Sequence, residues 1–459
     1  LRSGEDGAVH VGVNSFGYGG TNAGGILRSA PVHTLKRQES LKPSESLLVP
    51  INAMGVETAK ALATAYADLL ENEKGPDAED LCFSAGAYRT PLQFQTVIIG
   101  SDRQELVQEL RKFVDTKTSP RIVSGRRRNG APLKPVFVFS GMGSQWKGMG
   151  QHLVRHALPE ALKTAQRIDR LFSELSGWSI IDEILADRSS SRIDETIVAQ
   201  PAIFIIQVVL AEIYRLHGIE PSAIVGHSVG EVAAAYIAGA LTVEDAVTVI
   251  YHRSQQQARL AGRGTMLAIG LSGEAATQRF LVSYADSVSI AAYNSMQSCT
   301  LAGTEEALKA IAADCHENGI FNSLLRVEIP YHSFMMDEVH DDLTAALANI
   351  SPRAASEVLY STVTGTRWGN SERHDAAYWF DNARKPVLFQ NAIQDLLDKG
   401  ERVFLEIGTH PVLSGLIRET AQQLEGDAVI IPSLTRRDPE NLAIARSIAR
   451  LYMAGVPLD

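Results

Sequence analysis

One strand–turn–helix stretch constrains the fold more than any other part of the chain, because it places a serine at a sharp turn. Residues 223–226 predict a buried parallel strand, and the alanine-rich 232–238 predict a helix. Gly226 and Gly230 flank Ser228. Glycine is needed at both positions because a side chain there would collide with the strand or the helix. The turn lifts the serine hydroxyl above the sheet edge, beside the free N–H groups of a helix N-terminus. This arrangement indicates acyl transfer.

Strands and helices alternate on both sides of this turn. Residues 135–141 predict a buried strand that runs into a glycine-rich loop, and 199–216 predict the helix that precedes the serine strand. Further strands are expected at 359–362, 403–408 and 429–431. Alternation of this kind predicts an α/β fold, and we expect an α/β-hydrolase-like core built on a parallel sheet.

Residues 264–329 follow a different order of elements. The hydrophobic pattern predicts strand, helix, strand, strand, helix and strand, which is the ferredoxin-like order βαββαβ. The last of these strands is expected at 324–329, where Pro330 stops it. We expect this segment to form a compact subdomain inserted in the larger core.

A small α/β domain is expected ahead of the core, because 459 residues are too many for one typical hydrophobic core. Its predicted strands are 47–53 and 94–100, and its predicted helices are 56–71, 77–87 and 102–115. The basic cluster Arg126-Arg127-Arg128 adjoins glycines and indicates a solvated linker. A last amphipathic helix is expected at 441–453.

Composition excludes several classes of protein. The net charge of −10 argues against a nucleic-acid binder. No apolar run approaches the length of a membrane span, and the N-terminus has no signal peptide and starts abruptly, as an excised piece of a longer chain would. The three cysteines have no spacing that suggests zinc or disulfides, so we expect no metal and a reducing, cytoplasmic location.

Three further positions carry chemistry. The loop at 141–145 has glycines that let backbone N–H groups converge, with the Gln145 amide nearby, although a plain strand–helix turn is the alternative. Gln200 precedes Pro201, which we expect at the first position of a helix. Arg253 falls on the buried face of the helix that starts after Thr242, and a buried arginine needs an anion, either a protein carboxylate or a substrate.

Twelve histidines compete for the role of general base. His332 has the best claim, because it follows a terminated strand about a hundred residues beyond the serine, and His410 at another strand end is the second candidate. His227 adjoins Ser228, so its side chain should point elsewhere. Four others are expected on the surface: His152, His217, His316 and His374.

These motifs resemble one family. From about 133 to 436 the sequence is similar to the acyltransferase domain of type I polyketide synthases and to the malonyl/acetyl transferase of animal-type fatty acid synthases. The matching motifs occur in the family's order: G-M-G-S-Q-W at 141–146, Q-P-A at 200–202, G-H-S-V-G-E at 226–231, Y-H-R-S at 251–254, A-A-Y-N at 291–294, Y-H-S at 331–333 and E-I-G-T-H-P-V-L at 406–413. The glycine-rich 16–22 resembles the closing segment of a ketosynthase domain, with Gly24 where that family usually has histidine.

The resemblance implies a domain plan. Residues 1–30 would be the ketosynthase tail, 31–132 the ketosynthase–acyltransferase linker domain, and 436–459 the post-acyltransferase linker. The acyltransferase would comprise a large subdomain, 133–263 and 330–435, and the ferredoxin-like 264–329.

The resemblance also implies roles for the candidate residues. Ser228 would be the nucleophile and His332 its base, oriented by backbone rather than by a third acid. The backbone N–H groups of Gln145 and Val229 would form the oxyanion hole. Arg253 would hold the substrate carboxylate bidentately. The remaining site residues would line the pocket: Gln200, His227, Asn294 and Tyr331.

The implied reaction moves a malonyl group from malonyl-CoA to the phosphopantetheine thiol of an acyl carrier protein, with no cofactor held by this chain and with a ketosynthase as a neighbouring partner domain. The aromatic Tyr331 and the aliphatic Val229 favour malonyl over methylmalonyl, because a ring beside the substrate α-carbon fills the space of an added methyl. Three alternatives remain: another acyl unit, an α/β-hydrolase-type esterase or thioesterase, and a non-catalytic scaffold segment, which the intact site residues argue against.

Overall fold

The computed structural model describes residues 9–20, 22–28, 46–127, 133–369 and 373–458. These residues belong to two compact units that divide between Glu45 and Ser46. The first unit contains an antiparallel hairpin of β1 (His10–Phe16) and β2 (Asn22–Arg28). Residues 1–8 and 29–45, which belong to the expected ketosynthase tail and the start of the expected linker domain, lie outside the described residues.

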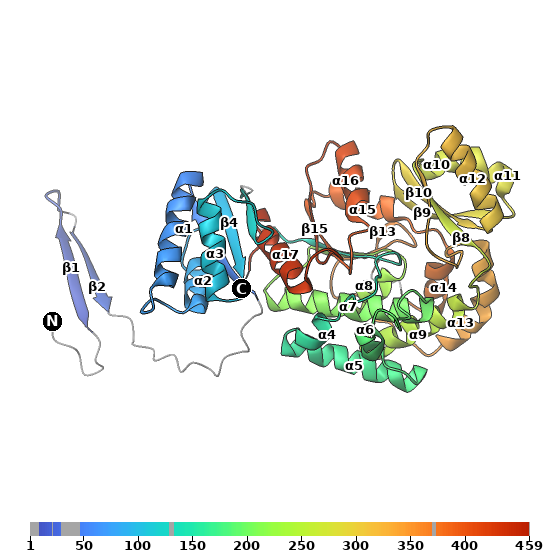
Figure 1. The fold of residues 1–459 in the computed structure, drawn as a ribbon, viewed down its shortest axis with the longest axis horizontal. Helices are drawn as coiled ribbons and strands as arrows, with labels where there is room; N and C mark the ends of the chain where they lie inside the picture. The colour runs from blue at the N-terminus through green and yellow to red at the C-terminus, as the bar shows by residue number, and fades with distance from the viewer. Residues whose placement is uncertain (1–8, 21, 29–45, 128–132, 370–372, 459) are drawn as a thin grey trace. The chain divides into compact units, whose positions relative to one another are not determined.

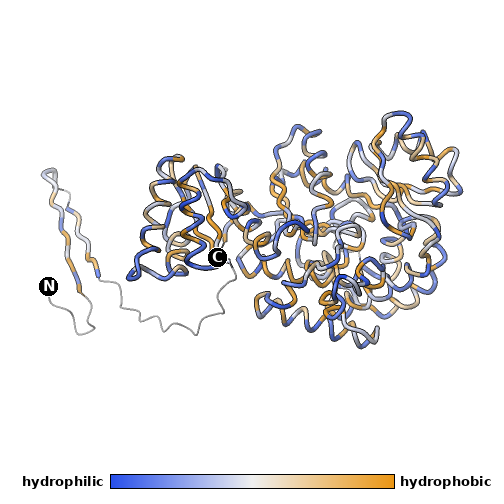
Figure 2. The backbone as a smooth tube through the Cα atoms, in the orientation of Figure 1, coloured by the Kyte–Doolittle hydropathy of each residue, from blue (hydrophilic) through white to orange (hydrophobic). Residues whose placement is uncertain are grey.

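The second unit starts with the small α/β domain (Figure 1). Its antiparallel sheet has the order β3-β4-β5, formed by β3 (Leu47–Ala53), β4 (Phe94–Gly100) and β5 (Ile122–Arg126). The three helices are α1 (Val56–Glu71), α2 (Ala78–Ala87) and α3 (Arg103–Val114). Figure 2 shows hydrophobic colour along the strands and alternating colour along the helices, as amphipathic helices on a sheet require.

Strand β5 was not expected, and it includes Arg126 from the segment that we had assigned to a linker. It is the last strand of its sheet and only partly buried, so its polar residues can face solvent. Polar composition therefore did not prevent pairing with β4.

The core sheet confirms the expected α/β-hydrolase-like arrangement. Its order is β13-β12-β7-β6-β14-β15, and every neighbouring pair is parallel except β12 with β13. The strands are β6 (Val136–Phe139), β7 (Ala223–Gly226), β12 (Leu359–Ser361), β13 (Thr366–Arg367), β14 (Val403–Ile407) and β15 (Val429–Pro432). Ligand sites in open parallel sheets lie beyond the carboxyl ends of the strands, so the serine that follows β7 is on the expected edge.

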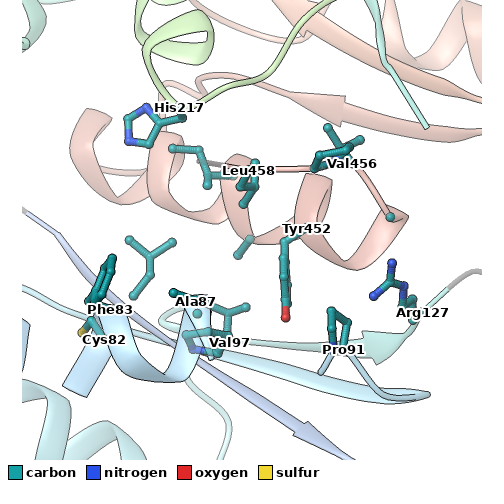
Figure 3. Close-up of a pocket in the computed structure, with 17 residues that line it drawn as sticks. Cys82, Phe83, Ala87, Pro91, Val97, Arg127, His217, Tyr452, Val456 and Leu458 are labelled. Carbon is teal, nitrogen blue, oxygen red and sulfur yellow. The ribbon is translucent and has the colours of Figure 1, made fainter. Parts of the chain in front are cut away.

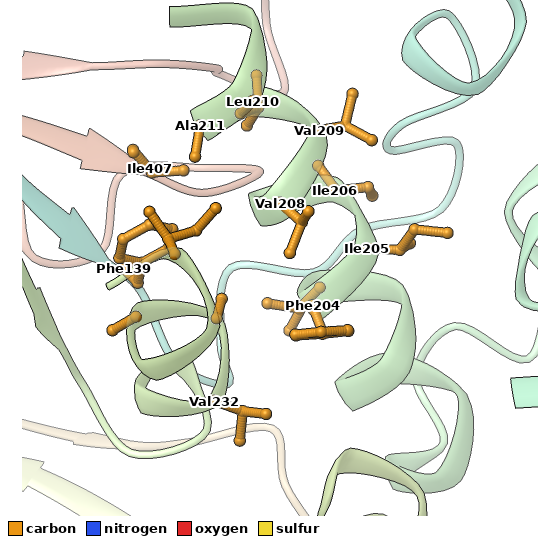
Figure 4. Packing of buried hydrophobic residues seen from close by; sticks show 14 of the residues in the cluster. Phe139, Phe204, Ile205, Ile206, Val208, Val209, Leu210, Ala211, Val232 and Ile407 are labelled. Atoms are coloured by element: carbon orange, nitrogen blue, oxygen red, sulfur yellow. The ribbon is translucent and has the colours of Figure 1, made fainter. Parts of the chain in front are cut away.

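Successive residues of β6 face opposite layers of the core. Phe137 and Phe139 pack in the cluster that contains most of the helical residues (Figure 4), whereas Val136 and Val138 pack in the cluster on the other side. The first layer includes α4 (Leu153–His156), α5 (Pro159–Ser176), α6 (Ile180–Leu185), α7 (Thr196–Leu216), α8 (Gly230–Ile237) and α9 (Val243–Ala258). The second includes α15 (Phe389–Asp398) and α16 (Ser414–Gln423).

Helix α7 contradicts two of the sequence predictions. Its 21 residues are long and apolar enough to cross a membrane, yet 83% of its most apolar window is buried inside the protein, so it is a core helix. Pro201 lies inside α7 rather than at its first position, because the helix begins at Thr196. Burial of nearly the whole helix stabilises it despite the backbone hydrogen bond that proline removes.

The ferredoxin-like subdomain has the sheet order β11-β8-β10-β9 and is antiparallel throughout. Its strands are β8 (Thr265–Ile269), β9 (Val288–Ser295), β10 (Ser298–Gly303) and β11 (Asn322–Leu324). Its helices are α10 (Gly273–Ala276), which continues as a π-turn (Thr277–Leu281) into α11 (Val282–Tyr284), and α12 (Glu305–Glu317).

The last strand of this subdomain was expected at 324–329, but β11 ends at Leu324. The chain leaves the sheet because Val327 and Ile329 pack in a separate cluster with Tyr331 and Met336. The apolar character of 324–329 thus reflects a second small core, not a strand.

A final group of elements completes the second unit. The chain after His332 forms a 3₁₀ helix (Phe334–Val339), α13 (His340–Ala346) and α14 (Ala376–Arg384), and it ends with α17 (Glu440–Ala454).

Helix α17 packs against both domains of this unit. Met453 and its neighbours contact β4, and Leu451 belongs to the main core. The Glu440 carboxylate accepts backbone N–H groups at the start of α4, and Tyr452 Oη donates to Asn52 Oδ1 of β3 at 3.1 Å. Beside α17 lies a largely apolar pocket of about 650 Å³, lined among others by Phe83 and Tyr452 (Figure 3), and it contains none of the predicted site residues.

Candidate active site

The serine turn has the geometry that its neighbours predicted. Ser228 follows β7 with φ of 54°, in the left-handed region that residues other than glycine seldom adopt. A Cβ added to Gly226 would lie 2.4 Å from the Glu231 nitrogen, and one added to Gly230 would lie 2.4 Å from the Phe139 oxygen. The prediction that only glycine fits at these two positions is confirmed.

A histidine lies within hydrogen-bond distance of the serine. Ser228 Oγ is 2.7 Å from His332 Nε2, and His332 Nδ1 is 2.9 Å from the backbone oxygen of Lys385. Because a carbonyl oxygen only accepts, Nδ1 carries the proton and Nε2 is free to accept from the serine hydroxyl. His332 also has a positive φ, of 58°. The histidine is thus oriented by backbone, with no carboxylate on Nδ1.

The surroundings of His332 keep it neutral. Burial in the first place, and then the neighbouring Arg253 guanidinium, lower the pKa of His332 to about 3, while the bond to Lys385 opposes this shift. A neutral imidazole is the form that accepts a proton, so the side chain is ready as a base at physiological pH.

Arg253 is 1% exposed and reaches the same serine from α9. Its Nη2 donates to Ser228 Oγ at 3.2 Å, Nε donates to Asn382 Oδ1 at 3.1 Å, and Nη1 donates to the amide oxygens of Gln200 at 2.8 Å and Gln257 at 3.0 Å. In the described part of the chain these acceptors are all neutral. Burial lowers the pKa of Arg253 to about 10, which still leaves it charged at neutral pH.

The predicted oxyanion-hole groups are free of other partners. Among the described residues the backbone N–H groups of Val229 and Gln145 have no hydrogen-bond acceptor. Val229 precedes the first residue of α8, where helix N–H groups lack intrahelical partners. The Gln145 side chain accepts from the Gly143 N–H at 2.7 Å and so braces its own loop. A Cβ at Gly141 would lie 3.5 Å from the Ser228 Cβ, which brings this loop to the serine.

The other predicted lining residues gather around the same point. His227 Nε2 is 3.5 Å from Asn294 Oδ1, and Asn294 Nδ2 donates to Thr300 at 2.8 Å. Burial lowers the pKa of His227 to about 4. Tyr331 is buried, and its hydroxyl is 2.5 Å from Thr196 Oγ1 at the start of α7.

Comparison with known proteins points to one family. The acyl transferase domain matches residues 136–457. The chain belongs to this acyl transferase domain family. Among curated proteins, the polyketide synthase GfsA of Streptomyces halstedii is 33% identical over 98% of this chain, and Erythronolide synthase EryA2 of Saccharopolyspora erythraea is 33% identical over 97%. The chain spans 6% and 12% of their respective lengths.

Solved acyltransferase structures are similar as well. The acyltransferase domain from module 8 of the salinomycin polyketide synthase has a TM-score of 0.84 and 29% identity, covering 91% of this chain and 97% of that one. A loading acyltransferase from the avermectin modular polyketide synthase has a TM-score of 0.65 and 32% identity, covering 69% and 99%.

Two histidine predictions for this acyltransferase have clear outcomes. His410, the second candidate for the base, is not among the hydrogen-bond partners of Ser228 Oγ in the described part of the chain, and its Nδ1 accepts from the Arg436 N–H at 3.5 Å. The expectation that His374 lies on the surface is wrong, because it is buried and stacks on Trp368 with ring centroids 4.0 Å apart. Burial lowers the pKa of His374 to about 3.

Sequence reasoning missed four residues of the acyltransferase site: Glu231, Thr196, Gln257 and Asn382. Glu231 is an acid in the first turn of a helix otherwise made of small apolar residues, and that contrast was a signal. Gln257 lies one turn after Arg253, and this spacing was a second signal. Asn382 comes from α14, which the sequence did not predict, so nothing pointed to it.

Proposed function

We propose that this acyltransferase takes a malonyl group from malonyl-CoA onto Ser228 and passes it to the phosphopantetheine thiol of an acyl carrier protein. One observation carries the proposal. The same serine oxygen lies 2.7 Å from a neutral histidine nitrogen and 3.2 Å from a buried guanidinium, that is, beside a base and beside a fixed positive charge.

The first half-reaction forms the acyl-enzyme. Ser228 Oγ attacks the thioester carbonyl carbon, its proton moves to His332 Nε2, and the carbonyl oxygen becomes an oxyanion facing the N–H groups of Val229 and Gln145. The C–S bond then breaks, and the CoA sulfur leaves with the proton from His332. In the second half-reaction the carrier thiol attacks the acyl-serine ester, with the same histidine taking its proton and returning it to Ser228.

A buried arginine without a carboxylate partner favours a dicarboxylic acyl group. Nη2 carries two N–H groups, and in the described part of the chain only Ser228 Oγ accepts from it. Nη1 already donates to Gln200 and Gln257, so a bidentate grip on the malonyl carboxylate requires exchange of one of these amide contacts.

The malonyl preference rests on Tyr331. Its hydroxyl is held by Thr196, so the ring cannot turn aside without losing a short hydrogen bond. A fixed aromatic ring near the substrate α-carbon, with Val229 rather than a polar residue after the nucleophile, disfavours the extra methyl of methylmalonyl. One methyl is worth about 1–3 kcal/mol, so we expect a preference of roughly 10–200-fold.

The hydrolase alternative is less well supported. Hydrolases of this fold orient their histidine with an acid, whereas His332 Nδ1 bonds a backbone carbonyl. A buried arginine that donates a hydrogen bond to the nucleophile also has no role in a simple esterase. The chain spans only a small share of its curated relatives. We therefore propose, as the resemblance implies, an acyl carrier protein and a ketosynthase as partners. The same holds for 1–30 as a ketosynthase tail and for 31–132 and 436–459 as linkers.

The test is intact-mass spectrometry after brief exposure to malonyl-, methylmalonyl- and acetyl-CoA in turn, followed by addition of a phosphopantetheinylated carrier protein. We expect a malonyl adduct that disappears as the carrier becomes loaded. Ser228→Ala should show no adduct. Retention of a covalent acyl group in that variant would sink the assignment, and an adduct lost to water rather than to the carrier would favour a hydrolase.

A further inference from the structure

Asn382 lies between the two buried charges of the site. Its Nδ2 donates to Glu231 Oε2 at 2.8 Å and to the Ser228 carbonyl oxygen at 3.1 Å, while its Oδ1 accepts from Arg253 Nε at 3.1 Å. Glu231 and Arg253 form no direct ion pair in the described part of the chain. The neutral amide of Asn382 therefore lies between the buried Glu231 side chain and the buried Arg253 guanidinium.

Within the described residues the Glu231 side chain is the acceptor in each of its hydrogen bonds. Its Oε1 accepts from the N–H and the hydroxyl of Thr362, and its Oε2 accepts from the Tyr378 hydroxyl at 2.7 Å and from Asn382. Burial raises the pKa of Glu231, and its hydrogen-bond donors oppose that shift. Oε2 meets the NH₂ end of the Asn382 amide, and the Ser228 carbonyl oxygen accepts from the same NH₂ group. These two acceptors together set which end of that amide faces Arg253.

We propose that Glu231 and Asn382 are positioning residues that set the orientation of the Arg253 guanidinium for a substrate carboxylate. This inference rests on the proposed function. With Asn382 Oδ1 on Nε, the Nη2 group on the same edge of the guanidinium points to Ser228, where the acyl group is formed. A reversed amide would set its NH₂ against the Nε–H, and two donors facing each other would turn the guanidinium away.

The neutral spacer also preserves the charge that the substrate needs. A carboxylate bonded directly to Arg253 would neutralise it and compete with the malonyl carboxylate. Asn382 supplies the hydrogen bond that fixes the guanidinium without supplying a negative charge. Glu231 bonds to Asn382 rather than to Arg253, and so holds the Asn382 amide in place.

The test is Glu231→Gln, which keeps the shape of the side chain but adds a donor. The anionic acceptor of Asn382 Nδ2 is then lost, and the Ser228 carbonyl oxygen alone still holds the NH₂ end of the amide. In competition between malonyl-CoA and acetyl-CoA, read as the two acyl-enzymes, we expect the malonyl preference to fall about tenfold, the worth of one hydrogen bond to a charged group. The loss should appear as a higher KM for malonyl-CoA, with acetyl transfer reduced far less.

Tyr378→Phe is the matched control, because it removes another donor from the same Oε2 and leaves Asn382 untouched. It should lower the melting temperature without changing the malonyl/acetyl ratio. If it shifts the ratio as much as Glu231→Gln does, Glu231 merely stabilises the fold and the inference is wrong.

A second variant covers the case in which Glu231→Gln does not fold. Asn382→Ala removes the acceptor from Arg253 Nε directly, and we expect the same fall in malonyl preference. An unchanged ratio in a folded Asn382→Ala protein overturns the inference. Failure of the proposed function itself would look different, since the unmodified enzyme would then carry no acyl group on Ser228.

Discussion

Arg253 Nη2 donates a hydrogen bond to Ser228 Oγ at 3.2 Å. The serine oxygen therefore accepts from a guanidinium while its own proton faces His332 at 2.7 Å. A positive charge beside the oxygen favours loss of that proton. In the function proposed above, the same guanidinium also binds the far carboxylate of the malonyl group.

Replacement of Arg253 by alanine should therefore change substrate selection. With Arg253→Ala the malonyl carboxylate would be buried without a partner, at a cost of about 1–3 kcal/mol, so malonyl acylation should fall by roughly 5–150-fold relative to acetyl. Competition between the two CoA esters, read by intact mass, measures this ratio. An unchanged ratio would mean that Arg253 serves only the folded structure.

The two candidate bases should differ sharply. His332→Ala should slow acylation by a factor on the order of 10²–10⁴, the usual contribution of a positioned base. His410→Ala should cost far less, because His410 faces Arg436 rather than the serine. Single-turnover acylation with malonyl-CoA compares them directly, and the reverse ranking would move the base to His410.

The lowered pKa of His332 predicts an unusual pH profile. Because the imidazole stays neutral until the pH approaches about 3, kcat/KM for acylation should remain nearly flat from pH 8 to about pH 5. A base with the ordinary pKa of about 6.5 would lose most of its activity over that interval. Initial rates in overlapping buffers of constant ionic strength check this, and a midpoint near 6.5 would show that His332 is more accessible to water than the structure indicates.

Thr196 should control the choice between malonyl and methylmalonyl through Tyr331. Thr196→Val keeps the shape but removes the hydrogen bond to the Tyr331 hydroxyl, so the ring can move and the expected 10–200-fold preference should shrink to a few-fold. Tyr331→Phe breaks the same bond from the other side and should behave alike. If the double variant has the same malonyl/methylmalonyl preference as either single variant, both residues act through one contact. An unaltered preference in the single variants would place the Tyr331 ring outside the acyl pocket.

His374 offers a prediction about stability alone. Among the described residues its buried Nδ1 has no hydrogen-bond partner, so His374→Phe should stabilise the protein by about 1 kcal/mol at pH 7.5. Because the folded pKa is about 3, the unfolded chain binds a proton at this histidine below about pH 6.5 while the folded chain does not, and stability is lost as the pH falls. Melting curves at pH 7.5 and 5.5 should show a smaller drop for the variant. His316→Gln, at an exposed position, is the control and should leave that drop unchanged.

Local steric rules explain what could be predicted from the sequence. The glycines around Ser228 and the helical spacing of Arg253 depend on a few neighbouring residues, and the structure has both features as expected. The central sheet could be predicted for the same reason, because buried strands such as β6 and β14 read as continuous apolar runs.

Other features depend on packing between distant segments, which no local pattern records. Asn382 reaches the Ser228 carbonyl oxygen across 154 positions of sequence, and α14 lacks a strong local signal. The apolar 324–329 looked like a strand because burial in a loop and burial in a sheet give the same composition. Pro201 was assigned to a helix start by a rule that tertiary packing of α7 overrides.

The way α17 is held has a practical consequence for anyone who cuts this chain. Glu440 caps α4, Ser447 Oγ lies 2.6 Å from Tyr214 Oη on α7, and Tyr452 bonds Asn52 of the small domain. Helix α17 therefore packs against both domains and is needed by each. A fragment that stopped at 435, although it would include every residue of the candidate active site, would expose apolar faces on two domains at once. We expect such fragments to aggregate on expression, and the chain from Ser46 onward to melt in one transition rather than two.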